Sequence, residues 1–202
     1  MYGSSTIGIL LLISHILACL TVGFIFRFWK KNTLSAFHFS PQNNNDISFS
    51  NLGSIIATSI SNATSTLFMI GGFVVLFSVI ISIFEESHIL PALTIFFAPF
   101  FSFLHIPSSF ISPMLIGFLE ITNGISQISC IHIKAISINI IITSFVLGLG
   151  GISVLMQIFS IISQSDLSIK PYIIGKVLQG IISALYTYLI ITIFPVFNFN
   201  LL

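Results

Sequence analysis

The segment GFLEITNG, residues 117–124, places a carboxylate, a hydroxyl and a carboxamide between two glycines in an otherwise apolar part of the sequence. Acidic groups within apolar, membrane-type segments are energetically costly and usually mark a path for substrate, ions or protons. We therefore take Glu120 as the first candidate for function. Thr122, Asn123 and Gly124 follow it closely, so an unwound turn there would present side-chain and backbone groups together. The alternative is that Glu120 lies in the outer headgroup region of a membrane, where an acid is ordinary.

A second polar interruption lies in residues 148–157, GLGGISVLMQ. Three glycines among its first four residues, including Gly150 and Gly151, free the backbone. Ser153 and Gln157 are spaced i and i+4, so they share one face of the helix that resumes after the glycines. Two interrupted segments in one small domain indicate a binding site, as in transporters with discontinuous helices. The alternative is a packing seam of small residues between helices.

Ser108 and Ser109 follow Pro107 in the middle of an apolar segment that prolines interrupt. At the tip of a hairpin, their hydroxyl and backbone amide groups would point at a site in the middle of the membrane. The alternative is that they cap a turn. His15, in the first apolar run, could pair with a carboxylate or a substrate, but a single histidine on an apolar helix more often bonds a neighbouring carbonyl group.

Sequence motifs give little support to catalysis. The sequence contains no HExxH, no CxxC and no phosphate-binding glycine loop, so we expect no enzyme, no cofactor and no metal site. Its two cysteines, Cys19 and Cys130, lie in apolar sequence and are interpreted as small buried hydrophobic residues. The lysines and arginines are scattered and form no basic patch, so we expect no nucleic-acid partner.

The elements that position these residues must be membrane helices. Of the 202 residues, 55% are hydrophobic and 5% are charged, which is too little polar surface for a soluble globule of this size. Several apolar runs approach the roughly 20 residues that a helix needs to cross a hydrocarbon core of about 30 Å. The sequence therefore predicts an all-α polytopic membrane protein in a lipid bilayer. We expect about four spanning helices, a re-entrant helical hairpin and a discontinuous helix.

Three regions follow one another along the chain. Residues 1–31 contain the first span, which stops at a cluster of cations, and the positive-inside rule places this end in the cytoplasm. Residues 32–63 form a polar cytoplasmic loop that ends in an interfacial helix near 52–60. Residues 64–202 form a membrane domain. Its predicted spans are 64–84, 135–163 and 177–194.

Residues 90–118 are apolar but interrupted by four prolines, which remove backbone donors and disrupt helices. They form either one kinked crossing or a re-entrant hairpin that turns near residues 105–109. With the hairpin, Lys134 lies outside and five cations lie in the cytoplasm: Arg27, Lys30, Lys31, Lys170 and Lys176. The single crossing would leave Lys170 and Lys176 outside, so the positive-inside rule favours the hairpin.

Several elements of the sequence together carry a resemblance to a known family. They are GILLLISH (8–15), VGFIFRF (22–28), GFLEITNG and GGISVLMQ (150–157). In this order they resemble the C-terminal half of the sporulation integral membrane protein YlbJ family. That family belongs to the nucleoside-recognition, or Gate, group of membrane domains, so the resemblance implies that residues 64–202 are a Gate-like domain.

The resemblance implies a function and partners. Family members are associated with endospore formation and with moving dipicolinate, a small planar dicarboxylate, from mother cell to forespore. Members generally have two Gate-like halves, so the resemblance implies a half that works with an N-terminal Gate half or as a homo-oligomer, in the bacterial cell membrane around the forespore. An ionised Glu120 would repel a dianion. In such a transporter it would bind a coupling proton or sodium ion, or stay protonated.

These observations lead to three functional hypotheses. The first is a transporter of a small polar metabolite, by resemblance dipicolinate, with alternating access around one polar site. The predicted site residues are Ser108, Ser109, Glu120, Thr122, Asn123, Gly124, Gly150, Gly151, Ser153 and Gln157. The second is a non-transporting membrane scaffold subunit of a sporulation complex. The third is a nucleoside transporter-like protein, because related Gate domains occur in nucleoside transporters and a nucleoside would accept Glu120 as a hydrogen-bonding partner.

Overall fold

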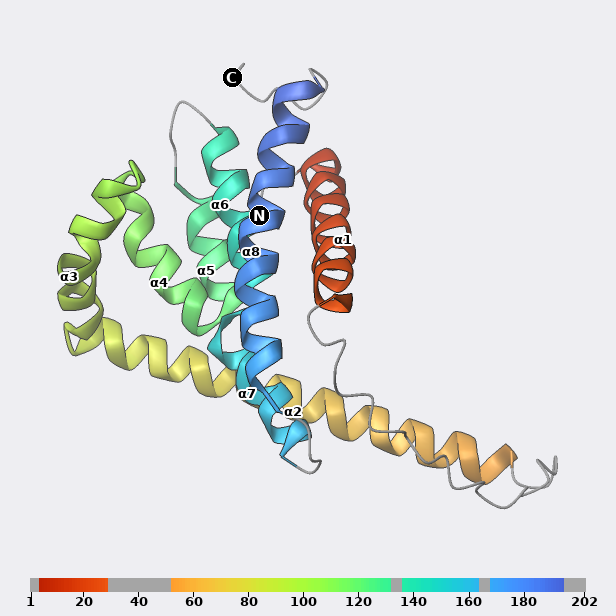
Figure 1. The fold of residues 1–202 in the computed structure, drawn as a ribbon. Helices are drawn as coiled ribbons and strands as arrows, with labels where there is room; N and C mark the ends of the chain where they lie inside the picture. Colours follow the sequence, from red (N-terminus) through yellow and green to blue (C-terminus); the bar gives the residue numbers. More distant parts are fainter. Residues whose placement is uncertain (1–3, 29–51, 132–135, 164–167, 195–202) are drawn as a thin grey trace.

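Helices form the regular structure of the residues that the computed structural model describes, which are 4–28, 52–131, 136–163 and 168–194 (Figure 1). Their bounds are α1 Ser5–Arg27, α2 Leu52–Glu86, α3 Ile89–Phe103, α4 Ile111–Leu119, α5 Ile121–Ser129, α6 Ile136–Leu149, α7 Gly151–Ile162 and α8 Lys170–Ile193, with a short 3-10 turn, η2, at Ser108–Phe110. α1, α2, α8 and the segment Ile136–Ile162 are each long and apolar enough to cross a membrane. The predicted all-α polytopic membrane fold is confirmed.

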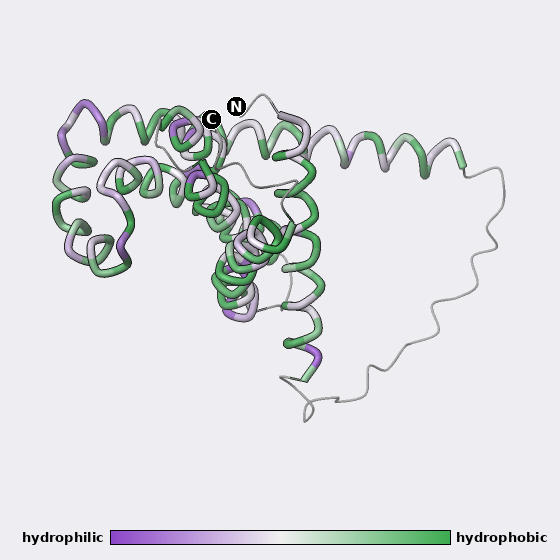
Figure 2. The backbone as a smooth tube through the Cα atoms, turned by 90° about the horizontal axis from the view of Figure 1, so that it is seen from above, coloured by the Kyte–Doolittle hydropathy of each residue, from purple (hydrophilic) through white to green (hydrophobic). Residues whose placement is uncertain are grey.

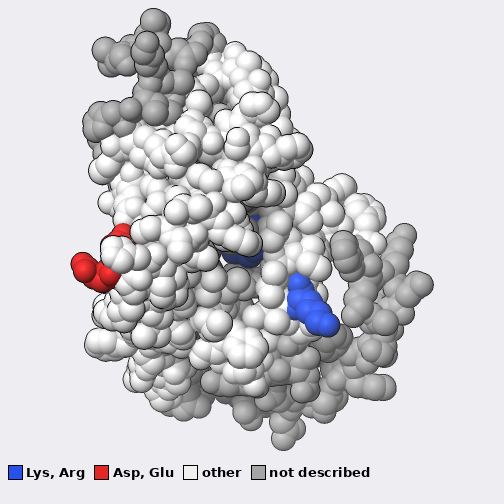
Figure 3. All heavy atoms as spheres, turned by 90° about the vertical axis from the view of Figure 1, so that its left-hand side faces the viewer, with Lys and Arg blue, Asp and Glu red and all other residues white. Residues whose placement is uncertain are grey.

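The surface of these helices is apolar. Figure 2 shows the helical backbone mainly in hydrophobic colours, and charged atoms cover only small parts of the face in Figure 3. Large side chains on α1 and α2 point outward: Leu20 is 66% exposed and Phe68 is 78% exposed. Contiguous apolar surface of this kind marks contact with lipid or with other protein, because water solvates it poorly.

Small residues bring α6 and α8 together as an antiparallel pair. The Ser144 and Ser183 hydroxyls are 2.7 Å apart, and Thr187 Oγ1 donates to Ser144 Oγ at 2.7 Å. Farther along, Gly148 lies against Gly180, where a Cβ added to Gly148 would be 2.7 Å from the Gly180 Cα atom. In lipid, helices associate through such close packing and interhelical hydrogen bonds, because burying apolar surface gains nothing there.

A neighbouring face of α8 carries α1, again antiparallel. Val22 and Phe26 lie beside Gly175 near the start of α8, while Ile7 packs with Ile191 near its end. The C-terminal end of α1 and the N-terminal end of α8 therefore lie at one end of the bundle, called the Arg27 end below. This arrangement agrees with the topology in which Lys170 and Lys176 share a side with Arg27. The other cations of the topology argument lie outside the described residues: Lys30, Lys31 and Lys134.

Between α3 and α5 the chain reverses direction twice. After α3 it turns at His105, whose φ of 56° is left-handed, and α4 returns beside α3 (Figure 1). This reversal agrees with the hairpin interpretation of residues 90–118 and not with a single crossing. α4 and α5 contain 9 residues each, about 13 Å at 1.5 Å per residue, so neither is long enough to cross a bilayer alone.

The second reversal, at Glu120, corrects the predicted topology. The hairpin interpretation places both ends of the hairpin at the outer face opposite Arg27, and the alternative interpretation of Glu120 places it in that outer headgroup region. In the structure this turn lies against the α6–α7 break, where a Cβ on Gly151 would be 3.1 Å from the Gly117 carbonyl oxygen. The break also contacts Lys176 of α8, so Glu120 belongs to the Arg27 end. The polar residues that follow Glu120 predicted an unwound turn, but no proline lies there, so the sequence did not predict that the chain reverses direction.

α2 is one continuous helix of 35 residues. The predicted separation between an interfacial helix at 52–60 and a span at 64–84 is therefore wrong. The threonine hydroxyls of this region find partners within the helix: Thr58 Oγ1 and Thr66 Oγ1 donate to carbonyl oxygens four residues earlier. Figure 1 shows α2 running across the lower ends of α1 and α8. The rest of the predicted loop, residues 32–51, lies outside the described residues.

α8 also begins earlier than predicted. The sequence interpretation started the last span at residue 177 and treated Lys170 and Pro171 as loop, whereas the helix begins at Lys170 with Pro171 in its first turn. Proline fits the first turn of a helix because its missing N–H would have no partner there. The consequence is that Lys176 lies inside the apolar helix and not in the preceding loop.

The α6–α8 contact gives a stability prediction. We expect Gly148→Ala to lower the free energy of unfolding by about 1–3 kcal/mol, because the new methyl group would meet backbone atoms of α8 at less than 3.0 Å. Gly71→Ala on α2 is the matched control, since nothing lies within 4 Å of its added Cβ. Thermal unfolding of both variants in the same detergent tests this. Equal midpoints would contradict the close packing of α6 on α8.

Candidate functional site: the meeting point of two helix breaks

Glu120 closes the turn between α4 and α5 as the N-cap of α5. Its backbone is extended, with φ −144° and ψ 122°, which separates the two helices. Oε1 accepts hydrogen bonds from the Thr122 backbone N–H at 3.0 Å and from Thr122 Oγ1 at 2.6 Å, and Oε2 accepts from the Asn123 N–H at 2.8 Å. The side chain is 2% exposed. The carboxylate therefore satisfies backbone donors that the first turn of α5 would otherwise leave unpaired in an apolar environment.

Two glycines allow the hairpin to be this tight. A Cβ on Gly124 would lie 2.2 Å from the Gly117 Cα atom, and a Cβ on Gly117 would lie 2.8 Å from a methyl carbon of Val146 on α6. Neither position has room for a side chain. The two glycines of the GFLEITNG segment are therefore needed for the contact of α4 with α5 and α6, whatever else the segment does.

Polar side chains of α5 link the turn to α2. Asn123 Nδ2 donates to Ser78 Oγ at 2.9 Å, and Gln127 Nε2 lies 3.4 Å from Glu85 Oε1. Thr122 is exposed, although its hydroxyl donates to Glu120. Of the predicted group at this turn, Glu120 and Gly124 are buried, whereas Thr122 and Asn123 remain accessible.

The second break separates α6 from α7 at two glycines in left-handed conformations. The φ angles are 89° at Gly150 and 62° at Gly151, a region that residues with a side chain rarely adopt. Gly151 lies on the first break: a Cβ there would be 3.1 Å from the Gly117 carbonyl oxygen and 3.3 Å from Ile121 Cγ1. The structure thus brings together the two interrupted segments that the sequence singled out.

The other predicted site residues divide into two groups. Ser153 and Gln157 lie on the buried face of α7, with 1% and 8% exposure. Ser108 and Ser109 are exposed in η2, at the far end of α4 from Glu120. The structure does not bring these two serines to the other predicted residues, because α4 separates them.

Lys176 is the residue of this region that the sequence interpretation missed. Its Nζ donates to the Gly148 carbonyl oxygen at 3.4 Å and to Gln179 Oε1 at 3.2 Å. The Gly148 carbonyl belongs to the last turn of α6, where the helix dipole favours a cation. Lysines near helix ends usually extend toward the membrane surface, but this side chain instead turns toward Gln179, farther into α8. The signal in the sequence was a lysine inside an otherwise apolar run after Pro171.

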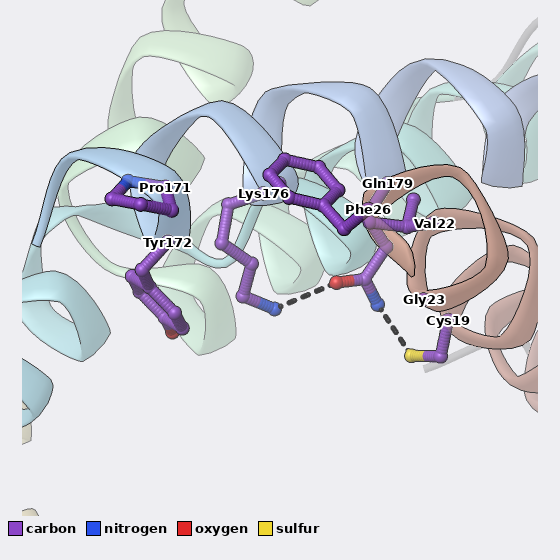
Figure 4. A pocket seen from close by; sticks show the side chains of 9 residues that line it. Cys19, Val22, Gly23, Phe26, Pro171, Tyr172, Lys176 and Gln179 are labelled. Atoms are coloured by element: carbon purple, nitrogen blue, oxygen red, sulfur yellow. Dashed lines mark hydrogen bonds between the residues drawn. The ribbon is translucent and has the colours of Figure 1, made fainter. Parts of the chain in front are cut away.

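Lys176 also borders a pocket between α1 and α8 at the Arg27 end, with a volume of about 400 Å³ (Figure 4). Within it, Gln179 Nε2 donates to Cys19 Sγ at 2.9 Å and lies 3.2 Å from His15 Nε2. A smaller cavity of about 120 Å³ lies on the side of the break, lined by Lys176 together with Gly151. Lys176 therefore connects the helix breaks with the α1–α8 pocket.

No three His, Cys, Asp or Glu side chains in the described part of the chain are grouped closely enough to hold a metal ion. The polar groups at and beside the breaks are hydrogen-bond donors and acceptors: the Glu120 carboxylate at the start of α5, and the Lys176 ammonium and Gln179 amide of α8. Such an arrangement can hold a small polar solute or an ion. It also stabilises the interrupted backbone itself.

The capping role of Glu120 can be tested separately from any role in binding. We expect Glu120→Ala to lower the free energy of unfolding by about 1–3 kcal/mol, because it leaves buried N–H groups of α5 without acceptors. Glu120→Gln should also destabilise, since its amide nitrogen would face an N–H donor. Glu86→Ala, an exposed acid at the end of α2, should change stability by at most about 0.5 kcal/mol. If Glu120→Ala and Glu86→Ala unfold at the same temperature in detergent, Glu120 does not act as a cap.

Comparison with known proteins gives the family. No protein-family model matches the chain, and no solved structure matches it. Over 139 residues, 69% of this chain, the sequence is 32% identical to the sporulation integral membrane protein YlbJ of Bacillus subtilis (strain 168). The match covers 34% of that protein, so the chain spans about a third of the length of this relative. Together with the four apolar helical segments, this similarity shows that the chain is a multi-pass integral membrane protein of the YlbJ family.

Proposed function

We propose that this chain is part of a membrane transporter that moves a small carboxylate metabolite, dipicolinate, during endospore formation. One observation carries the proposal: two interrupted helical segments meet at Gly117 and Gly151, and Lys176 lies beside the break between α6 and α7. Secondary transporters build their substrate sites from discontinuous helices of this kind. The name of the relative, a sporulation integral membrane protein, supports the cellular context.

The charges at the breaks support an anionic substrate. Lys176 Nζ has two neutral acceptors, Gly148 O and Gln179 Oε1, so its positive charge can still pair with an anion. Both carboxylate oxygens of Glu120 accept hydrogen bonds from the start of α5, where the helix dipole favours a negative charge. The repulsion between Glu120 and a dicarboxylate is therefore weakened, because backbone N–H groups of α5 pair with the Glu120 carboxylate.

Under this proposal the α4–α5 hairpin and α7 act as one gating unit. Contacts between glycines and carbonyl groups hold the two breaks together. Alternating access would then move the hairpin and α7 relative to the closely packed α6–α8 pair. The proposal is for transport and not for catalysis, with a second Gate-like half or another copy of the chain as partner.

A scaffold function is the second candidate, and α2 is the observation that favours it. Its Leu67, Phe68 and Val75 are 69%, 78% and 65% exposed, so much of this helix is available to another membrane protein. A scaffold subunit would use such surfaces for assembly and would need no solute site.

The distribution of dipicolinate during sporulation tests the transport proposal. Dipicolinate is measured separately in mother cell and forespore for cells with the native protein, a deletion, Gly151→Ala and Gly71→Ala. We expect the deletion and Gly151→Ala to lower forespore dipicolinate and raise it in the mother cell, because a methyl group at residue 151 strains the contact between the breaks. Gly71→Ala should behave like the native protein.

Protein amount in the membrane is matched by immunoblot for every strain. Normal forespore dipicolinate in the deletion strain would reject dipicolinate transport. If the deletion instead removes other sporulation proteins from the membrane while dipicolinate content stays normal, the scaffold function replaces the transport proposal.

A further inference from the structure

The pocket between α1 and α8 has the chemistry of a small-molecule site. Its volume of about 400 Å³ is within the range of about 300–1,000 Å³ for ligand pockets. Cys19 and Phe26 line it from α1, and Tyr172, Lys176 and Gln179 line it from α8. This pocket is separate from the predicted site residues, none of which contributes to its walls.

A cation is held in place inside this pocket. Figure 4 shows the Lys176 side chain extending between Tyr172 on one side and Gln179 on the other. Gln179 fixes the position of the ammonium group: its Oε1 accepts from Lys176 Nζ at 3.2 Å, and its Nε2 donates to Cys19 Sγ at 2.9 Å. An ammonium group has three N–H donors, and the acceptors at Gly148 and Gln179 use two of them. The third donor is the group that a ligand in the pocket would meet.

Aromatic rings form two of the walls. Tyr172 and Phe26 come from different helices, and the Phe26 ring lies beside Lys176 and Gln179 in Figure 4. Gly175 lets α1 pack closely here, because a Cβ at this position would be in van der Waals contact, at 3.8 Å, with Phe26 and Val22. Two aromatic side chains beside one fixed cation favour a flat ring that carries a negative charge.

We propose that this α1–α8 pocket binds a planar aromatic carboxylate whose carboxylate group pairs with Lys176 Nζ. The inference rests on the proposed function, because it names the residues that recognise the transported substrate. Lys176 contacts the ligand directly, and Gln179 is a positioning residue. The pocket lies at the Arg27 end, so the ligand enters from the side of the membrane on which Arg27 lies.

The two cysteines of the chain provide the test. Cys19 lines the pocket and Cys130 lies elsewhere, and both are exposed, which corrects the expectation that they are buried. In purified protein in phosphatidylcholine nanodiscs, the rate of N-ethylmaleimide modification is measured at each cysteine by mass spectrometry. At a dipicolinate concentration about tenfold above Kd, we expect modification of Cys19 to slow about tenfold, because the fraction of free sites falls as 1 + [L]/Kd rises. Modification of Cys130 should not change.

Matched variants identify the group that binds. Lys176→Met keeps the length of the side chain without its charge, and we expect it to raise the Kd for protection by about tenfold or more. Lys170→Met, an exposed lysine on the same helix, should leave protection unchanged. Succinate and pyridine, which lack the ring and the carboxylate respectively, should protect weakly. Equal slowing at both cysteines, or protection that survives Lys176→Met, would overturn the proposal.

Two further comparisons separate the possible sources of failure. If phosphatidylglycerol in the nanodisc protects Cys19 and dipicolinate does not, the pocket is a lipid-headgroup site and the aromatic carboxylate is rejected. Protection by dipicolinate combined with normal forespore dipicolinate in the deletion strain would retain the pocket and reject the proposed function. Loss of forespore dipicolinate in the deletion strain without protection of Cys19 would retain the function and reject the pocket.

Discussion

The last turn of α6 ends inside an apolar protein, and its carbonyl groups must find donors there because lipid offers none. The donor at Gly148 is Lys176 of α8. At the other break, the first N–H groups of α5 are satisfied by the Glu120 carboxylate. The Lys176 ammonium thus caps a helix C-terminus and the Glu120 carboxylate caps a helix N-terminus, and the helix dipole favours the sign of the charge in each case. The rest of the arrangement depends on these two closures, since without them the interrupted segments would have no stable place in the bundle.

Close backbone contact is the second requirement, and it explains why the breaks form one unit. Gly124 lies against Gly117, Gly151 lies against the Gly117 carbonyl oxygen, and Gly148 lies against Gly180. The contacts at Gly124 and Gly148 are too close for a side chain on the glycine, and the contact at Gly151 is tight. The hairpin, the α6–α7 break and α8 therefore share a continuous seam of backbone, and a displacement of one element must be accommodated by its neighbours.

The sequence predicted the fold class, because its apolar composition indicates a lipid environment. It also predicted the two interrupted segments, because their glycines and polar residues indicate breaks in a helix. It was insufficient for the role of Glu120: an acid that caps a helix and an acid that binds a solute look alike until the restart of the helix at residue 121 is known. Ser108 was wrongly placed in the site because residues 111–119 form the helix α4, which separates the hairpin turn from Glu120. The position of Lys176 within a helix was missed because Pro171 suggested a loop, although proline also fits the first turn of a helix, as it does in α8.

Lys176 gives the proposed transporter a physical link between ligand and backbone. The same ammonium group bonds the end of α6 and lines the α1–α8 pocket, so a carboxylate that pairs with its third N–H donor would draw the group toward the pocket. The bond to Gly148, at 3.4 Å, is the longer of its two hydrogen bonds and would be the first to lengthen when the group moves. Binding would then weaken the closure of α6 at Gly150, where the backbone already has the freedom to rearrange. In this arrangement the substrate acts on the gating unit through a single side chain, and the gate would respond only to a ligand that carries a negative charge.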